Sequence, residues 1–173
     1  NISSLESAKK VLALGFEKII INSQAFENPE LIKQLSRETG SQSIVVSIDV
    51  KKNIFGKYYC WSYSGTKKTS FIALDAAQKF VELGAGEILL NNIDRDGMMS
   101  GFDVNLIREL SLNLPVPIAS CGGAGSMEDI KEAILKGKSS AVVAGSLFVY
   151  HGPHKAVLIN YPGYDKIKKA LEL

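Results

Sequence analysis

The sequence has little cysteine, and that scarcity excludes several classes of protein. Its two cysteines, Cys60 and Cys121, are far apart and form no CxxC or zinc-binding pattern. Free thiols fit a reducing compartment, so we expect a cytoplasmic protein without a disulfide framework. His151 and His154 have no companion cluster of carboxylates or cysteines, so we expect a surface loop there, with no metal and no cofactor.

Net charge and long apolar runs are also lacking. The 20 basic and 18 acidic residues leave a net charge of +2, which is too small to indicate nucleic acid or a polybasic membrane surface. No apolar run approaches the ~20 residues that cross a bilayer. We therefore expect no nucleic-acid partner and no membrane association.

What the sequence does contain is a repeated joint between helix and strand. LALGFEKIIIN, VELGAGEILLNN and ILKGKSSAVVAGS each read as helix end, glycine, short gap, apolar strand and polar tip. Such recurrence is typical of stacked βα units. Strands that are apolar throughout are buried on both faces, which indicates a parallel, helix-covered sheet. A doubly wound sheet and part of a (βα)8 barrel both fit.

The predicted helices and strands alternate along the chain in this pattern. The predicted strands are residues 18–22, 44–49, 87–94, 117–121 and 141–146. The predicted helices are residues 4–14, 29–39, 73–83, one led by Asp103, 127–136 and a short one from Asp165. Residues 53–70 alternate aromatic and polar side chains, which predicts a hairpin over one rim of the fold. No strand precedes the first helix, so we expect the sequence to be the tail of a longer protein.

The stretch IVVSIDVKK, residues 44–52, places an acid at the tip of a buried strand. A carboxylate is costly to bury there unless it is paired or faces solvent. Asp49 could cap a helix, form half of a structural ion pair, or act as a catalytic acid or base. Strand tips are where α/β folds place their chemistry.

The stretch SCGGAGSMED puts glycines 122, 123 and 125 between a strand and a helix. Glycines let backbone N–H groups approach an anion, and a helix N-terminus attracts it, so the loop could bind phosphate. A tight turn with a capping box is the alternative, since Ser126 and Asp129 fit that pattern.

Three further strand tips are small or polar. Gly145 and Ser146 follow the next strand, and in barrel enzymes the loops after the last two strands often share one phosphate. Asp96 and Gly97 lie in NNIDRDG, where a turn closed by Gly97 is the alternative interpretation. INS, residues 21–23, is the last.

Taken together, SIDVKK, YSGTKKT, GAGEILLNNIDRDG, SGFD, PIASCGGAGSMED and AGSLF resemble HisF, the cyclase subunit of imidazole glycerol phosphate synthase. The resemblance covers nearly the whole chain, from within the third βα unit of that family to the eighth. It implies a (βα)8 TIM barrel of which about the last five units are present. Residues 1–173 would then form the C-terminal part of a single barrel domain.

The resemblance also implies an activity. The family's cyclase receives ammonia through the barrel interior from a glutaminase (HisH-like) partner. It uses the ammonia to convert a phosphorylated ribulosyl-aminoimidazole-carboxamide nucleotide to imidazole glycerol phosphate, in histidine biosynthesis. Two aspartates at opposite strand tips act as acid and base. Asp49 matches the second, and the first belongs on a strand that this sequence lacks, so we expect the given residues alone to be inactive.

The resemblance assigns further residues by position. Those that match the family's phosphate and substrate contacts are Asn22, Ser23, Asp96, Gly97, Gly122, Gly123, Gly145 and Ser146. Those at the opposite mouth, where ammonia enters and the glutaminase docks, are Lys18, Glu87, Glu17 and Gln42.

Two departures leave the substrate open. Cys121 stands where many relatives have serine, and the tail after Ser146 is unlike the family's usual ending. Both resemble a HisF-like branch encoded with bacterial surface-polysaccharide (lipopolysaccharide) genes, which supplies ammonia for sugar amidation. A phosphoribosyl-formimino isomerase and a non-catalytic activator of the glutaminase are the remaining alternatives.

Overall fold

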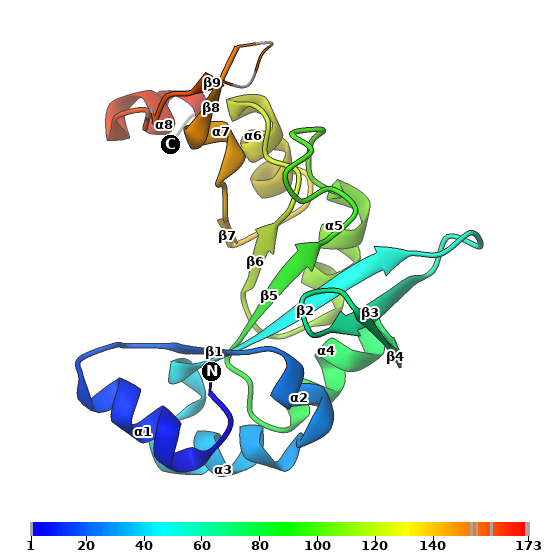
Figure 1. The fold of residues 1–173 in the computed structure, drawn as a ribbon, viewed down its shortest axis with the longest axis vertical. Helices are drawn as coiled ribbons and strands as arrows, with labels where there is room; N and C mark the ends of the chain where they lie inside the picture. Colours follow the sequence, from blue (N-terminus) through cyan, green and yellow to red (C-terminus); the bar gives the residue numbers. More distant parts are fainter. Residues whose placement is uncertain (1, 153, 155, 160, 172–173) are drawn as a thin grey trace.

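The structure, a computed structural model, describes residues 2–152, 154, 156–159 and 161–171. Its centre is a 7-stranded sheet in the order β4-β3-β2-β5-β6-β7, with β1 added beside β2 (Figure 1). The strands are β1 (Ile19–Ile21), β2 (Ile44–Lys52), β3 (Tyr58–Ser62), β4 (Lys67–Ile72), β5 (Glu87–Asn92), β6 (Ile118–Cys121) and β7 (Ala141–Val142). The pairs β1–β2, β2–β5, β5–β6 and β6–β7 are parallel, as predicted.

Helices connect these strands. They are α1 (Leu5–Ala13), α2 (Ser23–Glu27), α3 (Glu30–Thr39), the 3-10 turn η1 (Ser41–Ser43), α4 (Ala73–Glu82), α5 (Val104–Asn113), α6 (Met127–Leu135), α7 (Ser146–Val149) and α8 (Tyr164–Leu171). A small hairpin of β8 (Tyr150–His151) and β9 (Ala156–Val157) lies between α7 and α8. The last parallel strand is shorter than predicted, because the chain leaves the sheet after Val142 and enters α7 at Ser146.

Side-chain caps fix where several helices begin. Ser4 forms a capping box with Ser7 at the start of α1. Asp103 accepts a hydrogen bond from the backbone N–H of Leu106 at 3.2 Å and starts α5. A capping side chain satisfies an N–H that has no partner within the helix, so these short polar residues determine where α1 and α5 begin.

The helices cover one face of the parallel sheet. Helices α3 and α4 pack on β2, α5 packs on β6 and α6 packs on β7. On this side Ile44, Val46 and Ile48 are fully buried, together with Phe80 of α4. The opposite face is concave and open: Ile20 is 54% exposed and Val143 is 44% exposed. The predicted parallel, helix-covered sheet is therefore confirmed, with its helices on one face.

The open face explains why the strands are apolar on both sides. In a (βα)8 barrel the second face of each strand packs inside the barrel rather than against helices. Here β1 and β7 are the two ends of the parallel array, and α1 and α8 lie at opposite ends of the curved sheet (Figure 1). The fold is that of a partial barrel, mixed α/β with helices outside.

The predicted hairpin is also present, displaced slightly along the chain. The last residues of β2, Asp49 to Lys52, pair antiparallel with β3, and β3 pairs antiparallel with β4. The hairpin rises from the carboxyl end of β2 and extends away from the body (Figure 1). It therefore stands over the rim where the parallel strands end.

Candidate functional site

Three polar side chains form a row across the carboxyl ends of neighbouring strands. The register pairs Asp49 of β2 with Asn91 of β5, and Asn91 with Cys121 of β6. Residues i and i+2 share a face of a strand. Asp49 therefore points to the same concave side as Val45, and Asn91 to the same side as Leu89. The row closes one end of the concave face.

Asp49 is held by an amide. It is 8% exposed, and its Oδ1 accepts a hydrogen bond from Nδ2 of Asn91 at 3.1 Å. Since Asp49 lies within β2, it caps no helix, and no ion pair joins it to any residue that the structure describes. The structure thus gives Asp49 neither a helix to cap nor an ion pair with a described residue, and its catalytic role stays a prediction.

Asn91 is a site residue that the sequence interpretation missed. Its Oδ1 is buried and has no hydrogen-bond partner among the described residues, although such atoms are normally paired. The only signal was its place in the polar tip NNIDRDG, two residues before the turn. Asn91 therefore holds Asp49 with one atom and presents an unpaired acceptor with the other.

Of the two thiols, Cys121 belongs to this row and Cys60 lies close enough to feel the charge of Asp49, and both are protonated at neutral pH. Burial, reinforced by the negative charge of Asp49, raises the pKa of the Cys60 thiol to about 12. Burial and the charge of Asp96 also raise the pKa of Cys121. A protonated thiol is a weak nucleophile, so neither cysteine is arranged for covalent chemistry.

The glycine loop after β6 packs against the loop after β5. A Cβ atom on Gly122 would lie 2.4 Å from the carbonyl oxygen of Asn92, and one on Gly123 would lie 2.1 Å from that of Gly101. Gly101 N–H also donates to the Gly123 carbonyl at 2.8 Å. The two glycines are thus required by this close approach of backbones, whatever the loop binds.

The serine N-cap predicted for α6 is present, but the Asp129 carboxylate bonds to the N–H of Gly125 rather than to that of Ser126, which a capping box requires. Ser126 accepts a hydrogen bond from the N–H of Asp129 at 3.1 Å, and the Asp129 carboxylate accepts one from Gly125 N–H at 3.1 Å. This carboxylate already lies at the positive end of α6. Backbone N–H groups for an anion are therefore better supplied by the glycines before the helix, or by the next loop.

That next loop is open. Gly145 precedes α7 with φ −117°, and a Cβ atom built on it meets nothing within 4 Å. Ser146 is the first residue of α7. Barrel enzymes commonly hold phosphate between the loops after the last two strands and a short extra helix, which is the arrangement of β6, β7 and α7 here.

The remaining predicted contacts lie at the same rim. Asn22 donates from Nδ2 to the Ser47 carbonyl at 3.2 Å, and Ser23 donates to Asn22 Oδ1 at 3.1 Å. Ser23 also accepts from the N–H of Tyr63, which ties the hairpin to the end of β1 at 2.9 Å. Asp96 and Gly97 are exposed in the turn after β5. The structure thus brings all eight predicted contacts to the carboxyl ends of the strands.

An ion pair marks the opposite end of the concave face. Lys18 Nζ lies 2.5 Å from Glu87 Oε2, and Glu87 is four residues before Asn91 on β5. Glu17 and Gln42, which were predicted for the same end, are exposed beside these strand starts. Four residues of strand span about 13 Å, which is the distance from the ion pair to the row of Asp49.

An apolar hollow lies beside this ion pair on the concave face. It has a volume of about 250 Å³ and is lined by Lys18, Ile20, Val45, Glu87, Leu89, Ala119 and Val143. Apart from the ion pair at its entrance, the lining is aliphatic. Such a surface offers little to an ion and admits a small neutral molecule.

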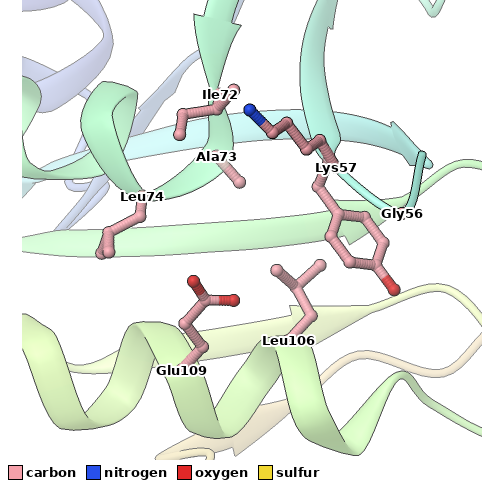
Figure 2. A pocket seen from close by; sticks show the side chains of 8 residues that line it. Gly56, Lys57, Ile72, Ala73, Leu74, Leu106 and Glu109 are labelled. Carbon is pink, nitrogen blue, oxygen red and sulfur yellow. The ribbon is translucent and has the colours of Figure 1, made fainter. Parts of the chain in front are cut away.

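Another hollow lies outside the concave face. It has a volume of about 220 Å³, and Figure 2 shows it between the hairpin tip, the start of α4 and α5, with Lys57 reaching toward Ile72 and Glu109 on the far wall. It contains none of the predicted site residues. Among the described residues there is no group of three metal-binding side chains, and no helix is long and apolar enough to cross a bilayer.

Comparisons with known proteins agree with this geometry. The sequence model of the family described as "Histidine biosynthesis protein" matches residues 2–155. A Leptospira interrogans protein, named provisionally as imidazole glycerol phosphate synthase subunit HisF, is 47% identical over 171 residues, which cover 98% of this chain and 67% of that protein. A Vibrio vulnificus protein with the same provisional name, as subunit hisF3, is 46% identical over 173 residues, covering 99% and 66%.

A third relative carries the name without qualification. It is the imidazole glycerol phosphate synthase subunit HisF of Alkaliphilus metalliredigens, 39% identical over 150 residues, which cover 87% of this chain and 60% of that protein. The chain thus spans about two thirds of the length of the curated relatives that it matches.

Proposed function

Because this chain belongs to the histidine biosynthesis protein family, and within it to the HisF group, we propose that it serves the cyclase half of an ammonia-using synthase. The proposed reaction converts a phosphorylated ribulosyl-aminoimidazole-carboxamide nucleotide to imidazole glycerol phosphate. A glutaminase partner supplies the ammonia. No metal or cofactor is needed for the steps assigned below.

The observation that carries this proposal is the alignment of Asp49 above the apolar hollow. Ammonia entering beside Lys18 and Glu87 would cross an aliphatic surface, which favours the neutral molecule over ammonium. It would arrive about 13 Å farther on at the row of Asp49 and Asn91. A guarded entrance, an apolar path and an acid at its end are the parts that such a transfer requires.

Asp49 is assigned as a general acid or base. Its Oδ1 is fixed by Asn91, while its Oδ2 has no hydrogen bond to a described residue and is free to meet a substrate proton. A positioned carboxylate within reach of the reacting group is what proton transfer in a closed site needs. Asp49 itself is only 8% exposed, which limits the access of bulk water to its carboxylate.

The phosphate groups of the substrate are assigned to the strand tips. By their position we assign these contacts to the backbone N–H groups of Gly122 and Gly123 after β6, and of Gly145 and Ser146 at the start of α7. Asn22, Ser23, Asp96 and Gly97 complete the same rim from the other side. These assignments rest on position and on the open space at Gly145.

The exchange Asp49→Asn tests the proposal. In the protein as its gene encodes it, supplied with ammonium and the nucleotide, the exchange should abolish product formation while leaving the fold intact. The matched control is Asp165→Asn, in the exposed first turn of α8, which should leave the rate unchanged. Turnover of the Asp49→Asn protein at the parental rate would remove the assigned role.

A second candidate function is ammonia supply for amidation of a surface sugar. It rests on the resemblance of the tail after Ser146 to a HisF-like branch encoded with surface-polysaccharide genes. The presence of Cys121 in the row points the same way. Offering the complex the nucleotide together with glutamine labelled with ¹⁵N in its amide separates the two: label in imidazole glycerol phosphate supports the cyclase, and release of labelled ammonia without that product supports ammonia supply to another acceptor.

A further inference from the structure

The hairpin of β2, β3 and β4 is strongly basic. Its residues 50–72 contain five lysines and neither aspartate nor glutamate; the lysines are Lys51, Lys52, Lys57, Lys67 and Lys68. Of the chain's 20 basic and 18 acidic residues, 15 and 18 remain outside the hairpin. The small net charge of the chain therefore hides a positive hairpin on a negative body.

The tip of this hairpin exposes two large apolar side chains. Ile54 is 94% exposed and Phe55 is 82% exposed. They occupy the two central positions of a turn closed by a hydrogen bond from Gly56 N–H to the Asn53 carbonyl at 3.0 Å. Such positions usually hold glycine, proline, asparagine or aspartate, so Ile-Phe is not explained by the turn itself.

The turn is rigid and holds these side chains outward. Oδ1 of Asn53 accepts from the N–H of Phe55 at 3.0 Å and from the N–H of Lys57 at 2.8 Å. The Asn53 N–H donates to the Lys57 carbonyl at 2.8 Å, and Gly56 has the positive φ of 84° that the closure needs. An ordered tip loses little conformational freedom when it binds.

Lysines surround the base of the tip. Lys52 Nζ lies 5.2 Å from the centre of the Tyr58 ring, and Lys68 Nζ lies 3.8 Å from that of Tyr59. Neither these two nor Lys57 forms an ion pair with a described residue. Asp94 accepts from the backbone N–H of Lys52, so one carboxylate lies nearby. The ammonium groups remain available to an outside anion.

We propose that the hairpin tip is a reversible contact with the surface of an anionic lipid bilayer. Ile54 and Phe55 enter the boundary between headgroups and acyl chains, while Lys52, Lys57 and Lys68 meet lipid phosphates. Apolar and aromatic side chains backed by lysines are the composition that binds in this interface. The hairpin extends beyond the helices, so the tip reaches a flat surface before the body does (Figure 1).

A bilayer fits the tip better than a protein or a nucleic acid. A specific protein interface buries at least about 1,000 Å², far more than two side chains on a convex turn supply. Single-stranded nucleic acid stacks on aromatic faces, and the rings of Tyr58 and Tyr59 are already covered by lysines. An aliphatic side chain such as Ile54 adds nothing to the stacking of nucleic-acid bases.

Sedimentation with vesicles tests the proposal in the protein as its gene encodes it. The vesicles are phosphatidylcholine with about one third phosphatidylglycerol, compared with phosphatidylcholine alone. We expect binding to the anionic vesicles only, lost at about 1 M salt. Ile54→Ser combined with Phe55→Ser should weaken partition at least about tenfold. Lys52→Gln combined with Lys57→Gln should weaken it about thirtyfold.

Matched controls separate the tip from general effects. Leu112→Ser changes an apolar side chain on α5 that is 65% exposed, and Lys10→Gln removes a charge from α1; both should bind as the parent does. Absence of sedimentation, or sedimentation that the tip exchanges leave unchanged, would overturn the proposal. Retention on an acidic protein column without vesicle binding would overturn it in favour of a protein partner.

Discussion

Asn91 Nδ2 donates a hydrogen bond to Asp49 Oδ1 across two adjacent parallel strands, at 3.1 Å. The two residues are direct neighbours in the register of β2 and β5, so the contact is built into the sheet rather than into a mobile loop. A catalytic carboxylate works best when its orientation is fixed before the substrate arrives. In this pair, a contact fixed by the register of the strands orients the carboxylate that is proposed to transfer protons.

Replacing Asn91 by leucine should slow the proposed reaction without unfolding the protein. Leucine has a similar size and lacks the amide that orients Asp49. A hydrogen bond to a charged group contributes about 1.5–3 kcal/mol, which corresponds to about ten- to hundredfold in rate. The measurement is ammonium-dependent turnover of the complete protein without glutaminase. Asn113→Leu, on the exposed side of α5, is the control, and an equal rate in all three proteins would contradict the assigned contact.

Two glycine exchanges should separate the needs of the fold from those of the ligand. Gly123→Ala places a Cβ atom 2.1 Å from the Gly101 carbonyl at a φ of +118°, and should destabilise the protein by several kcal/mol. Gly145→Ala meets no atom within 4 Å at a φ of −117°, and should leave stability nearly unchanged.

Phosphate affinity gives the second measurement for this pair. If the N–H groups before α7 hold phosphate, Gly145→Ala should weaken binding of the substrate nucleotide, because its methyl group would occupy the open space. Thermal unfolding and isothermal titration of the same preparations provide the two readings. Full affinity in Gly145→Ala would argue against a phosphate at this loop.

Lys18→Met should uncouple ammonia transfer while barely changing stability. The pair with Glu87 is half exposed on the lysine side, and exposed pairs contribute less than about 1 kcal/mol. Glutamine-dependent product formation should fall relative to formation from added ammonium. Lys9→Met breaks a comparable pair with Glu38 on the helices and should leave that ratio unchanged. If the ratio of glutamine-dependent to ammonium-dependent product formation were unchanged in Lys18→Met, the ion pair would have no role in ammonia transfer.

Cys60 should make stability fall as the pH rises above 9. Its folded pKa is about 12 and its ordinary value is 9.0, so between these the unfolded state releases a proton that the folded state keeps. Stability is then lost with rising pH, by about 1.4 kcal/mol per unit for one proton. Cys60→Ala should lose stability less steeply in urea unfolding from pH 8 to 10.5. Burial raises the pKa of Tyr58 in both proteins, so its effect cancels.

These 173 residues alone should associate with one another. The open concave face exposes Ile20 and Val143, and β1 and β7 each have an unpaired edge in the parallel array. Exposed strand edges beside apolar faces favour pairing with another chain. Analytical ultracentrifugation should show dimers or larger species whose share rises with concentration. A monomer at all concentrations would contradict this prediction, because the concave face would then stay exposed to water without association.

Local sequence was sufficient to predict the helices and strands, and to predict which residues lie at the rim where the parallel strands end. Glycine joints, capping residues and apolar runs act over a few residues, so they predicted the parallel strands, the helices between them and the hairpin. Because parallel strands end on one side, the same patterns also predicted that Asp49, Gly122 and Gly145 share a rim.

Only the tertiary structure decided which side chains meet. Whether the Asp49 carboxylate forms an ion pair or only a hydrogen bond depends on its neighbour across the sheet. That neighbour, Asn91, is 42 residues away in the chain. The close approach of Gly123 to Gly101 and the openness of the concave face are likewise set by long-range packing. The exposure of Ile54 and Phe55 depends on where the hairpin points. Local preferences specify conformation within a segment, whereas contacts between distant segments are fixed only when register and packing bring them together.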